Sequence, residues 1–291
     1  MKIIVTGSLG NIGKPLTTKL VAAGHDVTVI SSNADRKTAI ENLGAKAAVG
    51  SVSDAAFLLE TLKGADAIFA MTPPNLGGAN VIANTENAGK SFAKAIEEAQ
   101  VKRVVMLSSI GAHLPNGTGP IAGLHKIEEI YKELNTSVTF LRAGFFFTNF
   151  YNDVPMIQGA GIIGSNYPAD ITIPFVHPVD IAQAVAEELQ QTPAGKNIRY
   201  IISDVRTPGE AAKVLGAAIA KPELPWVEFT DEQALGGMAQ AGIPEEIANL
   251  YAEMGTGLRS GKIIEHFLSS NASVDGKIKL EDFAKEFATK F

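Results

Sequence analysis

The sequence predicts an α/β fold with a doubly wound parallel sheet and a smaller, mostly helical C-terminal cap. Two observations predict it. A glycine-rich segment, Thr6 to Gly13, follows the first apolar run directly and opens a helical stretch. Over about the first 145 residues, short β-branched runs alternate with helical stretches. These runs are continuously apolar, as strands buried on both faces of a parallel sheet are.

Taken in order, the elements alternate as a Rossmann-type sheet requires. Six runs are predicted as strands: Lys2–Thr6, Asp26–Ser31, Lys46–Val49, Ala67–Met71, Arg103–Ser108 and Val138–Arg142. The segments between them are predicted as helices: 12–23, 35–43, 54–62, 80–99 and 124–134.

This rhythm breaks after Arg142, which predicts a change of architecture. An aromatic cluster begins at Phe145, and segments punctuated by glycine and proline follow as far as about 176. We expect residues 1–150 to form the nucleotide-binding core and residues 151–291 a substrate or cap region, with 177–205 returning to the core. Further helices are expected near 177–191, 208–220, 230–240, 244–256 and 279–290, and a strand at 199–202.

Composition excludes several classes of protein. The net charge of −6 and the absence of a dense basic run argue against nucleic acid as a ligand. No segment approaches the roughly 18 uninterrupted apolar residues of a membrane span, and a cytoplasmic protein is expected. The chain has 0 cysteines, and its histidines and carboxylates show no ligand spacing, so no metal is expected.

The glycine loop predicts a site for a dinucleotide pyrophosphate. Gly7 makes the tight turn after the strand, Gly10 lets backbone amides approach the pyrophosphate, and Gly13 lets the helix pack closely on the strand. The helix N-terminus adds favourable electrostatics for an anion. The loop residues expected to bind the cofactor are Gly7, Ser8, Gly10, Asn11, Ile12 and Gly13.

The end of the second predicted strand favours NADP(H), with NAD(H) as the less favoured cofactor. A carboxylate is usual there in NAD sites, whereas this chain has Ser31 and Ser32, followed by Arg36. Hydroxyl and guanidinium groups suit a 2′-phosphate. Because ligands bind at the carboxyl ends of parallel strands, the residues after the other strands are also expected near the cofactor: Ser51, Met71, Thr72, Pro73 and Ser108.

Four segments together resemble the NmrA-like family of atypical short-chain dehydrogenase/reductases. They are Thr6–Gly13, Leu107–Ala112, Leu124–Glu129 and Thr139–Asn149, the last (TFLRAGFFFTN) being the more family-specific. The resemblance implies a Rossmann core that binds NAD(P). It also implies one of two activities, because the family includes NADPH-dependent quinone reductases as well as proteins that bind the cofactor as redox sensors or regulators.

The catalytic pair of ordinary short-chain dehydrogenases, Tyr-x-x-x-Lys, is absent. If Lys126 takes the place of the lysine, the position four residues earlier is Ala122, and Tyr131 lies on the wrong side. On the helical wheel Lys126 borders the apolar arc and His125 lies farther from it. The candidate catalytic residues are therefore Lys126, near the nicotinamide ribose, and His125 as a proton donor. Solvated helix residues are the alternative for both.

The aromatic run Phe145, Phe146 and Phe147 is expected to line an apolar substrate pocket, with a structural hinge as the alternative. These features predict an NADPH-dependent oxidoreductase that transfers hydride to a quinone or a similar small conjugated carbonyl. Two alternatives stay open: a non-catalytic NADP(H) sensor acting through a protein partner, and a reductase or isomerase with Lys126 as base. The sequence leaves the oligomeric state open.

Overall fold

The computed structural model describes residues 1–73, 79–192 and 194–291, which form two compact units. The chain passes between the units five times, after residues 108, 122, 142, 180 and 199. The first unit comprises Met1–Ser108, Gly123–Arg142 and Ile181–Arg199, and the second comprises Ser109–Ala122, Ala143–Asp180 and Tyr200–Phe291. The sequence suggested a simpler division at residue 150, with a return near 177–205.

The main sheet has seven strands in the order β10-β6-β5-β4-β1-β2-β3. The pairs β1–β2, β1–β4, β2–β3 and β4–β5 are parallel. The order reverses between β1 and β4, as in a doubly wound sheet, so the predicted fold class is confirmed. The strands are β1 (Lys2–Val5), β2 (Asp26–Ser31), β3 (Lys46–Val49), β4 (Ala67–Ala70), β5 (Arg103–Ser109), β6 (Ser137–Ala143) and β10 (Lys196–Ile201).

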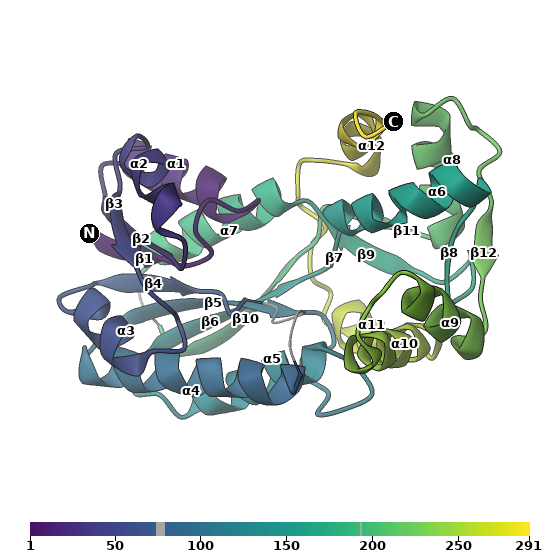
Figure 1. The fold of residues 1–291 in the computed structure, drawn as a ribbon. Helices are drawn as coiled ribbons and strands as arrows, with labels where there is room; N and C mark the ends of the chain where they lie inside the picture. The colour runs from purple at the N-terminus through teal and green to yellow at the C-terminus, as the bar shows by residue number, and fades with distance from the viewer. Residues whose placement is uncertain (74–78, 193) are drawn as a thin grey trace. The chain divides into compact units, whose positions relative to one another are not determined.

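Helices cover both faces of this sheet, which explains why its central strands are continuously apolar. Figure 1 shows α3, α4 and α5 on one face and α1, α2 and α7 on the other. All four residues of β4 and all seven of β6 are buried. The helices are α1 (Gly13–Ala22), η1 (Ala34–Arg36), α2 (Lys37–Glu41), α3 (Ala55–Leu62), α4 (Val81–Glu98), α5 (Ile121–Lys132) and α7 (Pro178–Gln190).

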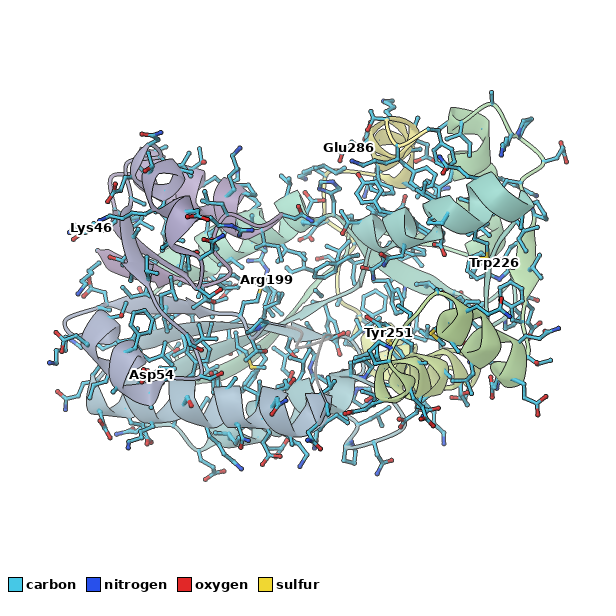
Figure 2. The ribbon with its side chains drawn as sticks, in the orientation of Figure 1. Lys46, Asp54, Arg199, Trp226, Tyr251 and Glu286 are labelled. Carbon is cyan, nitrogen blue, oxygen red and sulfur yellow. The ribbon has the colours of Figure 1, made fainter. Side chains whose placement is uncertain are left out.

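A buried ion pair joins the start of β5 to α7. The Arg103 side chain is 3% exposed and that of Glu188 is 10% exposed, with Nη2 and Oε2 2.5 Å apart. Arg103 also donates to the hydroxyls of Ser137 and Thr139, at 3.1 and 2.8 Å. Arg199, labelled in Figure 2, adds a second cation 3.1 Å from Glu188. This network satisfies both buried charges, as burial of charge requires.

The second unit contains two small sheets, ordered β11-β9-β7 and β12-β8, and most of the C-terminal helices. The Trp226 indole, labelled in Figure 2, stacks on the Tyr167 ring with centroids 5.3 Å apart and donates to its carbonyl at 3.0 Å. The elements are β7 (Phe145–Phe146), η2 (Phe147–Asp153), α6 (Val154–Ala160), β8 (Ile163–Ser165), β9 (Ile173–Val176), β11 (Asp204–Arg206), α8 (Pro208–Ala218), β12 (Trp226–Glu228), α9 (Asp231–Gln240), α10 (Glu245–Arg259), α11 (Lys262–Ser269) and α12 (Leu280–Ala288).

Helices α8 and α9 begin where their sequences predict. The Thr207 and Thr230 hydroxyls each accept a hydrogen bond from the backbone amide of the third helical residue, Glu210 or Gln233. The side chain of that residue in turn accepts a hydrogen bond from the threonine amide. Short elements escaped the sequence analysis: α11 was not predicted, and the strands between 145 and 176 were expected to be loops. These strands have two to four residues each, too few to show a hydrophobic period. In the described part of the chain, no helix combines the length and apolar character that a membrane span needs.

Candidate functional site

The glycine loop between β1 and α1 adopts a backbone that side chains would obstruct. Gly7 has a φ of +88° and Ser8 a φ of +52°, and the Gly10 amide donates to the Gly7 carbonyl at 3.2 Å. A Cβ on Gly13 would lie 2.1 Å from the Ser8 carbonyl oxygen. The tight turn assigned to Gly7 therefore has a direct geometric cause. Gly13 is required by the close approach of α1 to the loop backbone at Ser8 and Gly7, and not by the packing on β1 that the sequence predicted.

The start of α1 offers backbone donors to an anion. The N-cap residue Ile12 makes no side-chain capping hydrogen bond, and the first turn of α1 carries no acidic residue. Gly10 and Asn11 are exposed beside it. The Lys14 amide donates to the Gly10 carbonyl at 3.1 Å and Pro15 has no amide hydrogen, so the Gly13 amide and the helix dipole are what the first turn of this ten-residue helix offers to a phosphate group. The residues of this loop thus fit the pyrophosphate of a dinucleotide.

The three residues predicted to bind the 2′-phosphate at the end of β2, Ser31, Ser32 and Arg36, differ in exposure. Ser31 is buried and fully hydrogen-bonded: it donates to the Asn33 carbonyl at 3.0 Å and accepts from the Ser8 hydroxyl at 3.0 Å and the Asn33 amide at 3.2 Å. Ser32 and Arg36 are exposed. Ser31 therefore braces the glycine loop against β2, and only Ser32 and Arg36 keep groups free to face a 2′-phosphate.

The ends of β3 and β4 place the other predicted cofactor residues at the same edge of the sheet. Ser51 is exposed after β3, and its hydroxyl accepts from the Ser53 amide at 3.2 Å. Met71 follows β4, and its methyl carbon lies 2.1 Å from where a Cβ on Gly7 would be. Its amide donates to the Thr6 hydroxyl at 2.7 Å. Met71 thus packs over the glycine loop, with Thr72 half-buried and Pro73 exposed after it.

Ser108, near the carboxyl end of β5, belongs to a buried polar cluster that the sequence analysis missed. Its hydroxyl donates to Glu128 Oε1 of α5 at 2.6 Å. Arg142, in β6, donates to the same carboxylate from Nε at 3.0 Å and from Nη2 at 2.6 Å. Ser108, Glu128 and Arg142 are 3%, 0% and 2% exposed. An arginine within the apolar run of β6 was a signal that a buried acid must lie opposite.

In α5, Lys126 is more exposed than His125, which is the reverse of what the helical wheel predicted. The Lys126 side chain is 45% exposed and pairs with Glu86 of α4 at 2.9 Å, whereas His125 is half-buried. Lys90 and Lys126 hold the pKa of Glu86 below its ordinary value by hydrogen bonding. The ammonium group of Lys126 is thus engaged in an ion pair, as a solvated helix residue would be. Its catalytic role, like that of His125, stays a prediction.

Tyr131 does not replace the missing catalytic tyrosine. Its side chain is 1% exposed, and burial raises the pKa of its phenol well above the ordinary value. A phenol with a raised pKa is a weaker proton donor at neutral pH. The helix therefore carries no tyrosine that could act as the usual acid of short-chain dehydrogenases.

The aromatic run in the second unit is only partly available to a ligand. Phe147 is fully buried, with its ring 5.6 Å from that of Phe175 and 5.4 Å from that of Phe283. Phe145 and Phe146 form β7 and are half-buried. The structure thus corrects the expectation for Phe147, because a side chain enclosed on all sides by the core has no face left for a substrate.

Asp153, at the end of η2, is an ionisable group that the sequence analysis did not single out. It precedes α6 but makes no side-chain capping hydrogen bond. Burial raises the pKa of its carboxyl to about 7, and burial together with the Asp153 charge raises the pKa of Tyr167. Such a carboxyl changes its charge near neutral pH.

This pKa predicts a specific dependence of stability on pH. Because the folded-state pKa lies above the ordinary value of 3.8, the folded protein retains the proton more strongly than the unfolded chain. The favourable contribution is present below about pH 4 and is lost as pH rises through about 7. The Tm of Asp153→Asn minus the Tm of the wild type should therefore increase from pH 5 to pH 8, as measured by differential scanning fluorimetry. The same difference in Tm at both pH values would contradict this prediction. Asp170→Asn, at an exposed position, is the control.

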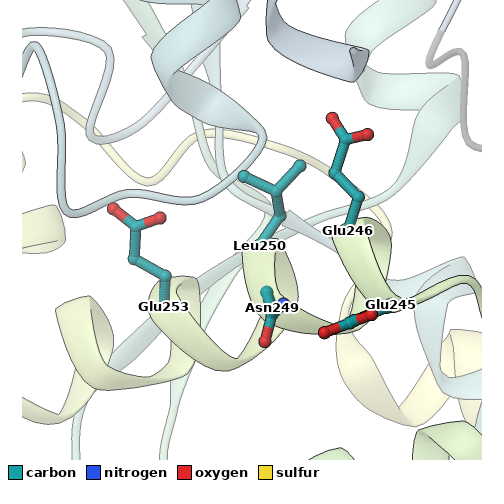
Figure 3. A pocket seen from close by; sticks show the side chains of 5 residues that line it. All are labelled: Glu245, Glu246, Asn249, Leu250 and Glu253. Carbon is teal, nitrogen blue, oxygen red and sulfur yellow. The ribbon is translucent and has the colours of Figure 1, made fainter. Parts of the chain in front are cut away.

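A depression with a volume of about 410 Å³ lies along α10 and is lined mainly by acidic and polar side chains. Figure 3 shows its lining residues, Glu245, Glu246, Asn249, Leu250 and Glu253, along one side of the helix. Carboxylates repel phosphate groups and suit an apolar acceptor poorly. This depression therefore fits neither the cofactor nor the expected substrate. Among the described residues, no group of three or more His, Cys, Asp or Glu side chains could hold a metal ion.

A comparison with curated proteins matches part of the chain. A curated relative is the (4-alkanoyl-5-oxo-2,5-dihydrofuran-3-yl)methyl phosphate reductase of Streptomyces griseus, 27% identical over 191 residues. The match covers 65% of this chain and 64% of that enzyme, so the chain matches less than two thirds of the length of that relative.

Solved structures show the same fold over nearly the whole chain. The NADPH-dependent quinone oxidoreductase of Escherichia coli, complexed with NADPH, superposes with a TM-score of 0.81 at 18% identity, covering 98% of this chain and 99% of that one. The triphenylmethane reductase of Citrobacter sp., complexed with NADP(H), has a TM-score of 0.79 at 20% identity, covering 99% and 100%. The model of the NmrA-like family matches residues 1–273. The chain therefore belongs to the NmrA-like family.

Proposed function

We propose that this chain is an NADPH-dependent oxidoreductase that transfers hydride to a quinone or a similar small conjugated carbonyl. The observation that carries the proposal is the glycine loop, in which Gly7, Gly10 and Gly13 free the start of α1 for a pyrophosphate. The exposed Ser32 and Arg36 at the end of β2 supply a hydroxyl and a guanidinium for a 2′-phosphate.

The names of three similar proteins support the reductase class. The relative from Streptomyces reduces a furanone phosphate, and the two structural neighbours are a quinone oxidoreductase and a triphenylmethane reductase, solved with NADPH or NADP(H). When bound, the reduced nicotinamide supplies a hydride, and the acceptor takes up one further proton as NADP⁺ is formed. The partly exposed rings of Phe145 and Phe146 are candidate apolar contacts for a flat acceptor.

The missing tyrosine agrees with this choice of acceptor. Hydride addition to a quinone gives an aromatic hydroquinone anion, which water can protonate, so no strong acid is required. An unactivated ketone gives an unstable alkoxide, which ordinary short-chain dehydrogenases protonate with their tyrosine. Since Ala122 stands where that tyrosine would be and Tyr131 is buried, quinones are the better fit. No contact among the described residues favours the alternative of a cofactor sensor without turnover.

The test is a titration of the purified protein with NADPH and with NADH by nicotinamide fluorescence. Menadione is then added and the loss of absorbance at the nicotinamide band is followed. Tight binding of NADPH with turnover supports the proposal. Binding without turnover of any member of a quinone panel would instead favour a sensor, and absence of binding would overturn both.

The preference for NADPH is expected to depend on Arg36. Arg36→Ala should weaken NADPH binding about 10-fold or more, because a charge-assisted hydrogen bond contributes about 1.5–3 kcal/mol. NADH binding should change little, since NADH lacks the 2′-phosphate. Lys37→Ala is the matched control, because Lys37 is exposed beside Arg36 and pairs with Glu41. Equal weakening of both cofactors by Arg36→Ala would contradict this assignment.

A further inference from the structure

The Glu128 carboxylate is completely buried in the first unit, and both of its oxygen atoms are used. Arg142 approaches Oε1 from Nε at 3.0 Å and Oε2 from Nη2 at 2.6 Å, and the Ser108 hydroxyl donates to Oε1 at 2.6 Å. The ion pair is bidentate, which fixes the carboxylate in orientation as well as in position. The direction of the Ser108 hydroxyl bond is therefore set by two other side chains.

Stability alone gives a weak reason for this arrangement. Removing two charges from water is costly, and apolar residues of similar volume often stabilise a fold at least as well. The exposed fractions of Glu128 and Arg142, 0% and 2%, leave almost no solvent to offset that cost. Because the carboxylate of this pair also accepts a hydrogen bond from Ser108, the pair is better explained by its effect on the Ser108 hydroxyl.

Donation to Glu128 changes the chemistry of Ser108. A hydroxyl group has one proton and two lone pairs, and the proton of Ser108 is taken by the carboxylate. The oxygen can then only accept a hydrogen bond, and the negative charge behind it strengthens that acceptance. Ser108 is thereby specified as an acceptor and is prevented from giving its proton to a substrate.

The topology assigns this acceptor to one half of the cofactor. Ser108 lies near the carboxyl end of β5, and a single strand, β4, separates β5 from β1 and the glycine loop. The order of the sheet reverses between β1 and β4, so a dinucleotide held at the loop has one half over β2 and β3 and the other over β4 and β5. The candidate 2′-phosphate residues follow β2, which leaves the nicotinamide half for β5.

We propose that Glu128, held by Arg142, is a positioning residue that fixes the Ser108 hydroxyl as a hydrogen-bond acceptor for the nicotinamide half of NADPH. The donor is a ribose hydroxyl or the carboxamide of that half. This inference rests on the proposed function, since it concerns the same cofactor site. Glu128 acts through Ser108 and does not itself touch the cofactor.

The test compares the binding of NADPH with that of 2′-phospho-ADP, which lacks both the nicotinamide and its ribose but keeps the 2′-phosphate and the pyrophosphate. Ser108→Ala, which keeps the Glu128–Arg142 pair, is expected to raise the Kd of NADPH about 5- to 10-fold, the usual effect of one hydrogen bond. The Kd of 2′-phospho-ADP is expected to stay unchanged. Loss of a merely structural contact would weaken both ligands alike, and that result, or an unchanged Kd for NADPH, overturns the proposal.

A double-mutant cycle then tests whether Glu128 acts through Ser108. Glu128→Gln is expected to weaken NADPH binding in the parent protein and to have no further effect on it in the Ser108→Ala variant. Full additivity of the two effects would overturn the assignment of Glu128. If Glu128→Gln does not fold, the ligand comparison on Ser108→Ala still decides the role of Ser108. Failure of the wild type to bind NADPH would refute the proposed function itself, which is a separate result.

Discussion

Replacement of Gly13 by alanine is expected to weaken NADPH binding by about 10- to 100-fold. The added Cβ would lie 2.1 Å from the Ser8 carbonyl oxygen and 3.3 Å from that of Gly7. Both are backbone atoms, so the loop itself must shift. Overpacking of this kind costs about 1–3 kcal/mol, and each 1.4 kcal/mol is a tenfold change in Kd. Isothermal titration calorimetry with NADPH measures the effect.

Gly237→Ala provides the matched control for this prediction. Gly237 lies in α9 of the second unit, and a Cβ there would meet no heavy atom within 4 Å. The control should leave the Kd unchanged and should stabilise the helix by about 0.5–1 kcal/mol. If Gly13→Ala bound NADPH as tightly as the control, the glycine loop would not be the pyrophosphate site.

Arg103→Met is expected to lower the free energy of unfolding by about 3–5 kcal/mol. The substitution removes the 2.5 Å partner of the buried Glu188 carboxylate and leaves the half-buried Arg199, 3.1 Å away, as its remaining cation, and breaking a buried ion pair is strongly destabilising. It also removes the donors to the Ser137 and Thr139 hydroxyls. Equilibrium unfolding in urea, monitored by circular dichroism, measures the loss.

Two further variants test whether the loss in the free energy of unfolding comes from the burial of the charges or from the loss of an ion pair alone. Lys94→Ala breaks an exposed ion pair with Glu98, at 3.9 Å in α4, and should change the free energy of unfolding by no more than about 0.5 kcal/mol. The double variant Arg103→Met/Glu188→Met should recover part of the stability lost in the single variant, because no unpaired charge remains. A double variant less stable than the single one would contradict this explanation.

The parts of the fold that local sequence determines were predictable. The runs that form β1 to β6 are rich in apolar residues, and the glycine loop marks where β1 becomes α1. The short strands of the second unit were not predictable, because β8 and β9 have only three and four residues. Their pairing depends on partners distant in the sequence, such as Trp226 for Ile163. Such pairing leaves no local period to detect.

In the candidate site, too, the features set by neighbouring residues were predictable and those set by distant residues were not. The backbone role of Gly7 was predictable because it depends on neighbouring residues. The relative exposure of His125 and Lys126 was not predictable, because only the apolar residues of the helix were used to predict which of its faces is buried. Burial of Glu128 beside Arg142 moves the buried arc of α5 away from Lys126. An arginine in an apolar strand indicates that a buried acid exists, but its position in the chain depends on the tertiary fold.

The repeated passage of the chain between its two units limits how the protein can be divided. Each unit is assembled from three separate stretches of sequence, so no single cut yields either unit whole. A fragment ending at residue 150 would contain the glycine loop but would lack α7 and β10. It would also bury the guanidinium of Arg103 without Glu188. The proposed nucleotide site therefore belongs to a unit that the C-terminal half of the chain helps to build, and an isolated N-terminal fragment is not expected to form that unit.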